Sequence, residues 1–173
     1  MSKRFPFPIP FGWFGIAHSD ELQPGDIKSL RYFGRELVLF RGEDGAVALV
    51  NAFCPHLGAH LGQGQVSGEH IVCPFHAWEF DAEGQVANIP YCEQMPGRAK
   101  EGAPLRAYPT VERNHMIYAW YHPEGKPPAW EVVELPEAGN EEWAQAVRKE
   151  WVVNTIPQEL SENVADPVHF LYV

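Results

Sequence analysis

The chain has 173 residues, of which 45% are hydrophobic and 21% charged, a composition that is typical of a folded globular protein. Asp and Glu outnumber Lys and Arg by 23 to 13, and the formal net charge of −10 argues against a nucleic-acid partner and against an anionic membrane surface. No apolar run reaches the ~18 residues that would span a bilayer, and three cysteines are an odd number for a secreted disulfide framework. We therefore expect a cytoplasmic protein with no nucleic-acid or membrane partner.

Short runs of β-branched and aromatic residues, separated by turns rich in Pro and Gly, predict a mainly β fold. The predicted strands are 36–41, 46–51, 70–72, 79–81, 85–87, 108–112 and 115–120. Asp44-Gly45 and Arg113-Asn114 each separate two such runs and predict hairpin turns. Short strands at this spacing are typical of an all-β sandwich or barrel.

The strand and turn pattern changes after about Tyr121. The elements predicted beyond it are a linker at 122–128, a helical turn at 141–149, a strand at 151–154 and a helix at 158–171. Pro167 is an irregularity inside the last helix. We therefore predict two domains, 1–121 with a Pro-rich arm at 1–11, and 122–173, a short α/β segment that begins a second domain.

Two short loops carry the candidate metal ligands. Cys54 and His56 are spaced C-x-H, Cys73 and His76 are spaced C-x-x-H, and sixteen residues separate the two pairs. Two hairpin tips that each supply one thiolate and one imidazole can bind a single metal centre. Thiolates favour zinc, copper(I) or iron–sulfur clusters, and imidazole favours zinc and iron.

This pattern of ligands resembles the Rieske [2Fe–2S] signature. The resemblance implies that Cys54 and Cys73 bind one iron and that His56 and His76 bind the other. It also implies a Rieske-type antiparallel β-sandwich with cluster-binding loops. The alternative is a structural zinc site with the same four ligands, although zinc fingers usually place both cysteines together and both histidines together.

Four further residues, in or after the two loops, are expected to have structural roles rather than to bind metal. We expect His60 to pack or hydrogen-bond rather than bind metal, and Cys92 to be an ordinary buried apolar residue. Trp78 is expected to pack beneath the cluster loop, with an indole N–H that can reach a polar group. Ala77 stands where the family commonly has Gly, and its Cβ is unfavourable if the backbone there has a positive φ.

The loops also indicate the branch of the family. Ala59 and Phe75 stand where respiratory Rieske proteins carry two cysteines that form a disulfide. The chain therefore resembles the Rieske ferredoxins and the Rieske non-haem iron oxygenases. The segments 31–38 and 54–62 look most like the steroid branch, which comprises the oxygenase component of ketosteroid 9α-hydroxylases and the cholesterol 7-desaturases.

Near the end of the chain, Asn163, Asp166 and His169 resemble the N-x-x-D-x-x-H stretch that opens the iron site of Rieske oxygenases. The resemblance implies that His169 is a ligand of the mononuclear iron(II) and that Asp166 is an inter-subunit electron bridge. The remaining ligands come later in the family, and four residues follow His169 here, so we expect an incomplete site on this chain. The alternative is a surface helix with incidental polar residues.

The resemblance implies the [2Fe–2S] electron-transfer domain of a Rieske oxygenase, a mono- or dioxygenase that hydroxylates an aromatic or steroid-like substrate with O₂. The chain by itself is not expected to be catalytically complete. The alternative is a stand-alone Rieske ferredoxin. The partners implied are an NAD(P)H-dependent reductase or a ferredoxin as electron donor, and further copies of the chain in a homotrimer.

Overall fold

The computed structural model describes residues 8–94, 96–100, 104–144 and 147–172. These divide into two units, Met1–Asn140 and Glu141–Val173, which are described separately. The first unit holds three antiparallel sheets, and this confirms the prediction of a mainly β fold. Of the short α/β segment predicted at the C-terminal end, the described residues show the helix.

The sheets are built from eleven short strands in the described part of the chain. The first sheet has the order β1-β11-β10, with β1 (Gly12–His18), β10 (Thr110–Arg113) and β11 (Met116–Tyr121). The second has the order β2-β3-β4-β9, with β2 (Ile27–Tyr32), β3 (Arg35–Arg41), β4 (Val47–Asn51) and β9 (Ala107–Tyr108). The third runs β5-β6-β7-β8, with β5 (Gln65–Ser67), β6 (His70–Val72), β7 (Glu79–Phe80) and β8 (Val86–Asn88). Three short helices connect them: η1 (Ser19–Glu21), η2 (Leu61–Gln63) and α1 (Gly97–Lys100).

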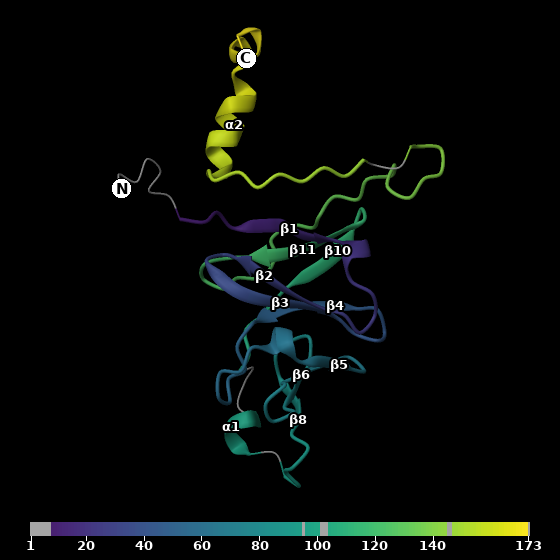
Figure 1. Cartoon of the computed structure of the whole chain (residues 1–173), viewed down its shortest axis with the longest axis vertical. Helices are drawn as coiled ribbons and strands as arrows, with labels where there is room; N and C mark the ends of the chain where they lie inside the picture. Colours follow the sequence, from purple (N-terminus) through teal and green to yellow (C-terminus); the bar gives the residue numbers. More distant parts are fainter. Residues whose placement is uncertain (1–7, 95, 101–103, 145–146, 173) are drawn as a thin grey trace. The chain divides into compact units, whose positions relative to one another are not determined.

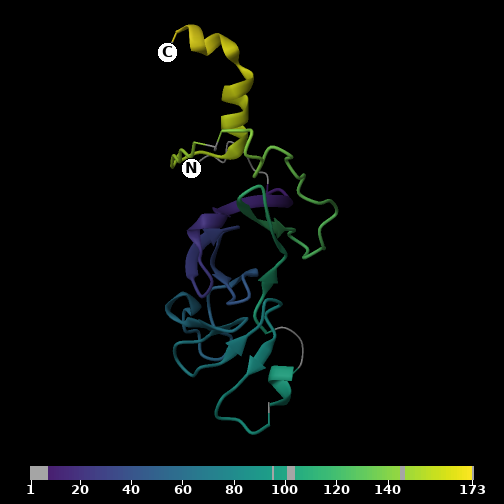
Figure 2. The same cartoon turned by 90° about the vertical axis from the view of Figure 1, so that its right-hand side faces the viewer.

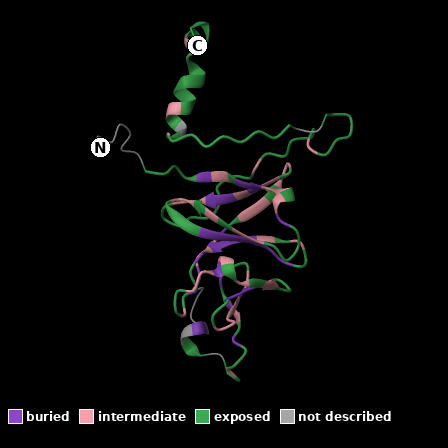
Figure 3. Cartoon of the chain, viewed as in Figure 1, coloured by how far each residue is buried: buried purple, intermediate pink, exposed green. Residues whose placement is uncertain are grey.

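The second sheet lies between the other two (Figures 1 and 2). Its strand β3 is buried on both faces, which explains its continuous apolar run. Leu37 and Leu39 enter one core, whose other members include Ile16, Ala17, Leu49, Ile117 and Ala119. Val38 and Phe40 enter the other core, whose other members include Val50, Leu61, Ile71, Phe80 and Leu105. Figure 3 shows these buried residues gathered along the strands of the first unit.

The predicted hairpin turns are close to those observed. Gly45, in the predicted Asp-Gly turn between β3 and β4, has a φ of +90°. Between β10 and β11 the two turn residues are Asn114 and His115, one position later than predicted, with φ values of +55° and +61°. Positive φ at both central residues is the type I′ pattern that matches the twist of the flanking strands, and Asn adopts it at low cost.

Two elements predicted in the second unit are wrong. Residues 151–154 form no strand, because no neighbouring segment in the described part of this unit pairs with their Val-Val sequence. Residues 141–144 and 147–149 form turns and irregular backbone rather than a helical turn, and the remaining two residues of that prediction, 145–146, lie outside the described residues. Local sequence propensity favoured these elements, but the described residues of the two segments lack the packing contacts that stabilise a short helix or strand.

The predicted helix at 158–171 is interrupted. It consists of α2 (Pro157–Ala165) and the 3₁₀ helix η3 (Pro167–Leu171), with Asp166 between them at φ −101° and ψ 92°. The interruption follows from Pro167, which lacks an N–H and disfavours a helical conformation in the residue before it. The Asp166 carboxylate then caps η3 by accepting a hydrogen bond from the N–H of Val168 at 3.0 Å.

Candidate metal centre

The first ligand loop, 54–59, follows β4 and is closed by two backbone hydrogen bonds. The N–H of Cys54 donates to the carbonyl of Ala59 at 2.8 Å, and the N–H of Gly58 donates to the carbonyl of Cys54 at 2.8 Å. The loop therefore forms a compact turn with His56 near its tip.

The second ligand loop, 73–78, connects β6 to β7 and repeats this arrangement. The N–H of Cys73 donates to the carbonyl of Trp78 at 2.8 Å, and the N–H of Ala77 donates to the carbonyl of Cys73 at 3.0 Å. The two loops thus share one backbone frame, although the histidine is two residues after the cysteine in the first loop and three in the second.

The fifth residue of each loop has a left-handed backbone conformation. Gly58 has a φ of +76° and Ala77 has a φ of +53°. The expectation that Ala77 stands at a position favouring Gly is consistent with this geometry, because a Cβ destabilises the left-handed conformation.

The two sulfur ligands point into the protein. Cys54 and Cys73 are 2% and 3% exposed, and both belong to the core between the second and third sheets. Burial raises the pKa of the Cys54 thiol to about 11; the N–H groups of His56 and Leu57 act against this rise, and the adjacent Cys73 thiol adds to it. The thiol is therefore protonated at neutral pH, so a metal that binds it must displace a proton.

The two imidazoles lie together on the outer side of the loops. The rings of His56 and His76 have centroids 4.8 Å apart, and both side chains are half-buried. Trp78 stacks on the ring of His56, with a centroid distance of 4.6 Å and an interplanar angle of 7°. Phe75, which is 61% exposed, flanks His76 at 3.9 Å.

The candidate ligands thus form two pairs, a buried thiol pair and an outer imidazole pair. This donor set fits a two-iron cluster in which each iron takes two protein ligands. Among the described residues, no group of three or more His, Cys, Asp or Glu side chains surrounds a position for one metal ion.

The second unit places the other predicted site residues beside each other. Asp166, between α2 and η3, has one carboxylate oxygen 3.9 Å from Nδ1 of His169, which is within η3. Asn163 is in the last turn of α2 and is exposed. Because the helix is interrupted at Asp166, Asn163 lies in α2 whereas His169 lies in η3.

Comparison with known proteins identifies the first unit. Residues 12–109 match the profile of the Rieske [2Fe-2S] domain. The chain belongs to the Rieske [2Fe–2S] domain family. Residues 119–173 match the 3-ketosteroid 9alpha-hydroxylase C-terminal domain. The resemblance to Rieske oxygenases that the sequence indicated is therefore confirmed.

Three relatives illustrate the match. Cholesterol 7-desaturase nvd of Xenopus laevis is 39% identical over 171 residues, which is 98% of this chain and 37% of the relative. The oxygenase component of a 3-ketosteroid-9-alpha-monooxygenase of Rhodococcus rhodochrous is 36% identical, over 94% of this chain and 41% of the relative. Dicamba monooxygenase, solved with non-heme iron and dicamba, has a TM-score of 0.57 and 29% identity over 68% of this chain and 37% of that chain. The chain thus spans about two fifths of the length of these relatives.

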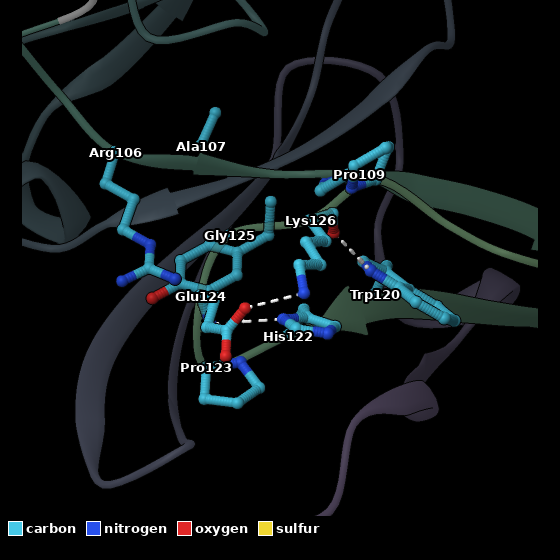
Figure 4. A pocket seen from close by; sticks show the side chains of 11 residues that line it. Arg106, Ala107, Pro109, Trp120, His122, Pro123, Glu124, Gly125 and Lys126 are labelled. Atoms are coloured by element: carbon cyan, nitrogen blue, oxygen red, sulfur yellow. Dashed lines mark hydrogen bonds and ion pairs between the residues drawn. The ribbon is translucent and has the colours of Figure 1, made fainter.

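Two of the hollows on the described part of the first unit differ in their relation to the ligand loops. The smaller, about 410 Å³, adjoins the second ligand loop of the Rieske domain and is lined by Gln63, Gly64, Gln65, Val72 and residues 73–77. The larger, about 640 Å³, is lined by none of the cluster-loop residues (Figure 4). In it the ammonium of Lys126 pairs with the carboxylate of Glu124 at 2.7 Å, and Trp120 donates to the carbonyl of Lys126. The larger hollow is therefore separate from the candidate metal centre.

His60 makes a hydrogen bond, as expected, whereas Cys92 packs against the core but is only partly buried. Nδ1 of His60 accepts a hydrogen bond from the N–H of Gly62 at 3.1 Å, and its Nε2 lies 3.6 Å from the carboxylate of Glu36. Cys92 is a free thiol, half-buried against the core that contains Cys54. Both residues belong to the packing around the Rieske loops.

Sequence reasoning missed Tyr91. Its hydroxyl accepts the indole N–H of Trp78 at 2.6 Å, and its side chain is 59% exposed. The expectation that the Trp78 indole reaches a polar group is correct, but the partner lies thirteen residues away beyond β8. No local sequence pattern predicts the hydrogen bond between Trp78 and Tyr91, because the Ile89-Pro90-Tyr91 sequence indicates only a turn.

No helix in the described residues is long and apolar enough to cross a bilayer.

Proposed function

We propose that this chain binds a [2Fe–2S] cluster, with Cys54 and Cys73 on one iron and His56 and His76 on the other. The observation that carries the proposal is the common backbone frame of the two loops, which presents a buried thiol pair and an outer imidazole pair side by side. When bound, a cluster of this type accepts and donates one electron at a time, at a potential of roughly −150 to +300 mV.

The residues around the ligands have separable tasks in this proposal. The core around Cys54 and Cys73 excludes water from the sulfur side. The N–H groups of His56 and Leu57 favour the thiolate of Cys54, which counteracts the effect of burial on its pKa. The half-buried imidazoles are the ligands nearest solvent, so an electron donor would approach the centre from their side.

For the whole protein we propose a Rieske oxygenase that acts on a steroid-like substrate with O₂. The support is the identity to a cholesterol 7-desaturase and to a ketosteroid monooxygenase component, and the match of residues 119–173 to a hydroxylase C-terminal domain. That second match favours an oxygenase over a stand-alone Rieske ferredoxin. A ferredoxin or an NAD(P)H-dependent reductase would supply electrons, and a cytoplasmic homotrimer is the assembly we propose.

In that oxygenase, His169 would be a ligand of a mononuclear iron(II) and Asp166 would support it. With its carboxylate 3.9 Å from Nδ1 of His169, Asp166 can accept a hydrogen bond from Nδ1–H after a small side-chain movement. This bond would fix the tautomer that leaves Nε2 free to bind metal. The same carboxylate would serve as the electron bridge between subunits.

Metal analysis and electron paramagnetic resonance of the purified, dithionite-reduced chain test the cluster. We expect two irons and two acid-labile sulfides per chain, and a signal with the low average g value of a histidine-ligated cluster. A colourless protein with one zinc would replace the proposal with a structural zinc site.

Variants at two neighbouring histidines test the ligand set. His56→Gln should abolish the Rieske signal, because an amide does not replace an imidazole on iron. His60→Gln is the matched control, since it makes the same substitution at a nearby histidine outside the proposed ligand set, whose Nδ1 accepts a hydrogen bond from Gly62. Loss of the cluster in both variants, or in neither, would contradict the assignment.

Replacement of His76 by Cys tests the second imidazole. A thiolate in place of a neutral ligand makes the cluster more negative, so the cluster should persist with a lower reduction potential. An unchanged potential would count against ligation by His76.

A further inference from the structure

The two candidate imidazole ligands have different surroundings. His56 is covered on one face by the indole of Trp78, which lies almost parallel to it at 7° and 4.6 Å. His76 is flanked by Phe75, which is tilted by 38° and 61% exposed. One imidazole is thus stacked against a large flat partner, and the other adjoins a tilted ring that faces solvent.

Trp78 makes one hydrogen bond through its backbone and one through its indole N–H. Its backbone carbonyl accepts the N–H of Cys73 and so closes the second ligand loop. Its indole N–H donates to the hydroxyl of Tyr91 at 2.6 Å. Tyr91 in turn belongs to a turn closed by the hydrogen bond from the N–H of Cys92 to the carbonyl of Ile89 at 3.0 Å. Trp78 is therefore attached to the second ligand loop through its backbone and to the turn at Tyr91 through its indole N–H.

This arrangement joins three separate segments of the chain. His56 belongs to the first ligand loop, Trp78 to the second, and Tyr91 to the turn after β8. The core behind them does not account for the indole N–H, because the N–H points to an exposed hydroxyl rather than into the core. If residue 78 served only for packing, Phe would be sufficient, because Phe has no N–H that needs a hydrogen-bond acceptor.

We propose that Trp78, held by Tyr91, is a positioning residue for His56, which sets the plane of that imidazole as a ligand. The inference rests on the proposed cluster and concerns the His56 side of it alone. Rotation of the His56 ring about its Cβ–Cγ bond would break the parallel contact with the indole, so the stack restricts that rotation. His76 has no comparable restraint among the described contacts.

The test uses the chain loaded with its cluster and three variants. Tyr91→Phe removes the acceptor of the indole N–H, Trp78→Phe keeps an aromatic face without the N–H, and Trp78→Leu removes the stack. Pulsed paramagnetic resonance measures the nitrogen couplings of the two histidine ligands separately, and potentiometry measures the reduction potential. Tyr118→Phe, on β11 in the first sheet, is the matched control for loss of a phenol hydroxyl.

We expect one of the two nitrogen couplings to shift or broaden in Trp78→Leu, the other to be retained, and the potential to change. Tyr91→Phe should show a weaker form of the same change, and cluster loss to a chelator about fivefold faster, as expected for one lost hydrogen bond. Tyr91→Phe should add nothing to Trp78→Phe, since both remove the same bond. Tyr118→Phe should match the unmodified chain.

Unchanged couplings and potential in a folded Trp78→Leu protein would overturn the inference, as would equal changes in both couplings. Additive effects of Trp78→Phe and Tyr91→Phe would also overturn it. If Trp78→Leu does not fold, the two conservative variants and their combination decide the question. Unmodified protein without a cluster would overturn the proposed function, whereas unmodified protein with a cluster and silent variants would overturn only the role of Trp78.

Discussion

At the scale of single residues, Ala77 is the clearest point of local strain in the site. Its φ of +53° places a Cβ in the left-handed region, whereas the equivalent position of the first loop is Gly58. We predict that Ala77→Gly stabilises the folded chain by about 0.5–1 kcal/mol. Gly relieves the backbone strain of the folded state, and this gain exceeds the cost of the greater conformational entropy that Gly gives the unfolded chain. The free energy of unfolding in urea measures it.

Gly58→Ala is the matched control for that prediction. A Cβ at Gly58 would meet no heavy atom within 4 Å, so its cost arises from the backbone conformation alone. We expect a loss of about 1 kcal/mol. A less stable Ala77→Gly protein would show that the Ala77 methyl makes contacts worth more than the strain.

The two loops that hold the candidate ligands could be located from the sequence, but the surroundings of these residues could not. Cys54, His56, Cys73 and His76 lie in two short loops, and the spacing within each loop carries the information. The contact of Trp78 with Tyr91 depends on how a turn thirteen residues away folds back. Such contacts are set by tertiary packing, which the local pattern does not encode.

At the scale of elements, an ion pair connects β3 to β10. Arg41 is 8% exposed, and its guanidinium donates to both carboxylate oxygens of Glu112, at 2.8 and 2.9 Å, and to the carbonyls of Leu22 and Gly45. The hydrogen bond from Arg41 holds the pKa of Glu112 below its ordinary value of 4.5. Because the folded pKa is the lower one, this stabilisation is complete above about pH 4.5 and is lost as the pH falls through the folded pKa.

We therefore predict that the unmodified chain loses stability more steeply below pH 4.5 than Glu112→Gln does. At neutral pH, Arg41→Met should cost about 3 kcal/mol, because it leaves the carboxylate and the carbonyls of Ser19, Leu22 and Gly45 without their donor. Urea unfolding between pH 3 and pH 7 measures both the pH dependence of the stability and the cost of Arg41→Met at neutral pH. Parallel pH profiles for the unmodified chain and Glu112→Gln would show that this carboxylate does not contribute to acid unfolding.

The segment after β11 is fastened to the first unit by the β10–β11 turn. The amide of Asn114 donates to the carbonyl of Val133 at 2.8 Å, and its side-chain oxygen accepts the N–H of Leu135 at 2.9 Å. Arg113 also donates to the carbonyl of Val132. These contacts attach residues 132–135 to the first unit, which extends to Asn140.

Asn114→Gly should release this segment without disturbing the turn, since Gly accepts a positive φ. We predict about fivefold faster hydrogen exchange at the Leu135 amide, equivalent to one hydrogen bond of about 1 kcal/mol. Asn114→Asp keeps the acceptor for Leu135 and should keep its protection. Equal exchange in all three proteins would mean that solvent, not Asn114, sets the protection of this amide.

Element prediction succeeded where a strand was long, apolar and closed by a turn, as for β3 and β11. It failed at 151–154, where two β-branched residues suggested a strand but no partner strand is present in the described part of that unit. The helix at 158–171 was predicted at the right place, and Pro167 was noted as irregular. The effect of Pro167 on the backbone of Asp166 determines how Asp166 and His169 lie relative to each other.

At the scale of the whole molecule, the two units differ in what they bury. Both cores consist of residues between Ile16 and Trp120, and none of the described residues in 141–172 is buried. Apolar side chains such as Trp151, Val152 and Leu171 are between 74% and 92% exposed. The folding free energy of the chain therefore arises almost entirely within the first unit.

A chain that ends at Asn140 should consequently keep its fold and its cluster. We predict a melting temperature within about 3 °C of the full chain, which corresponds to less than ~1 kcal/mol, and the same ratio of iron to protein. It should also associate less, because the exposed apolar residues of the second unit are removed. Calorimetry, iron analysis and light scattering on both chains give the comparison. Loss of cooperative unfolding on removal of 141–173 would show instead that the Rieske domain needs the second unit for its stability, and the electron-carrying module would then have to be redefined to include Asp166 and His169.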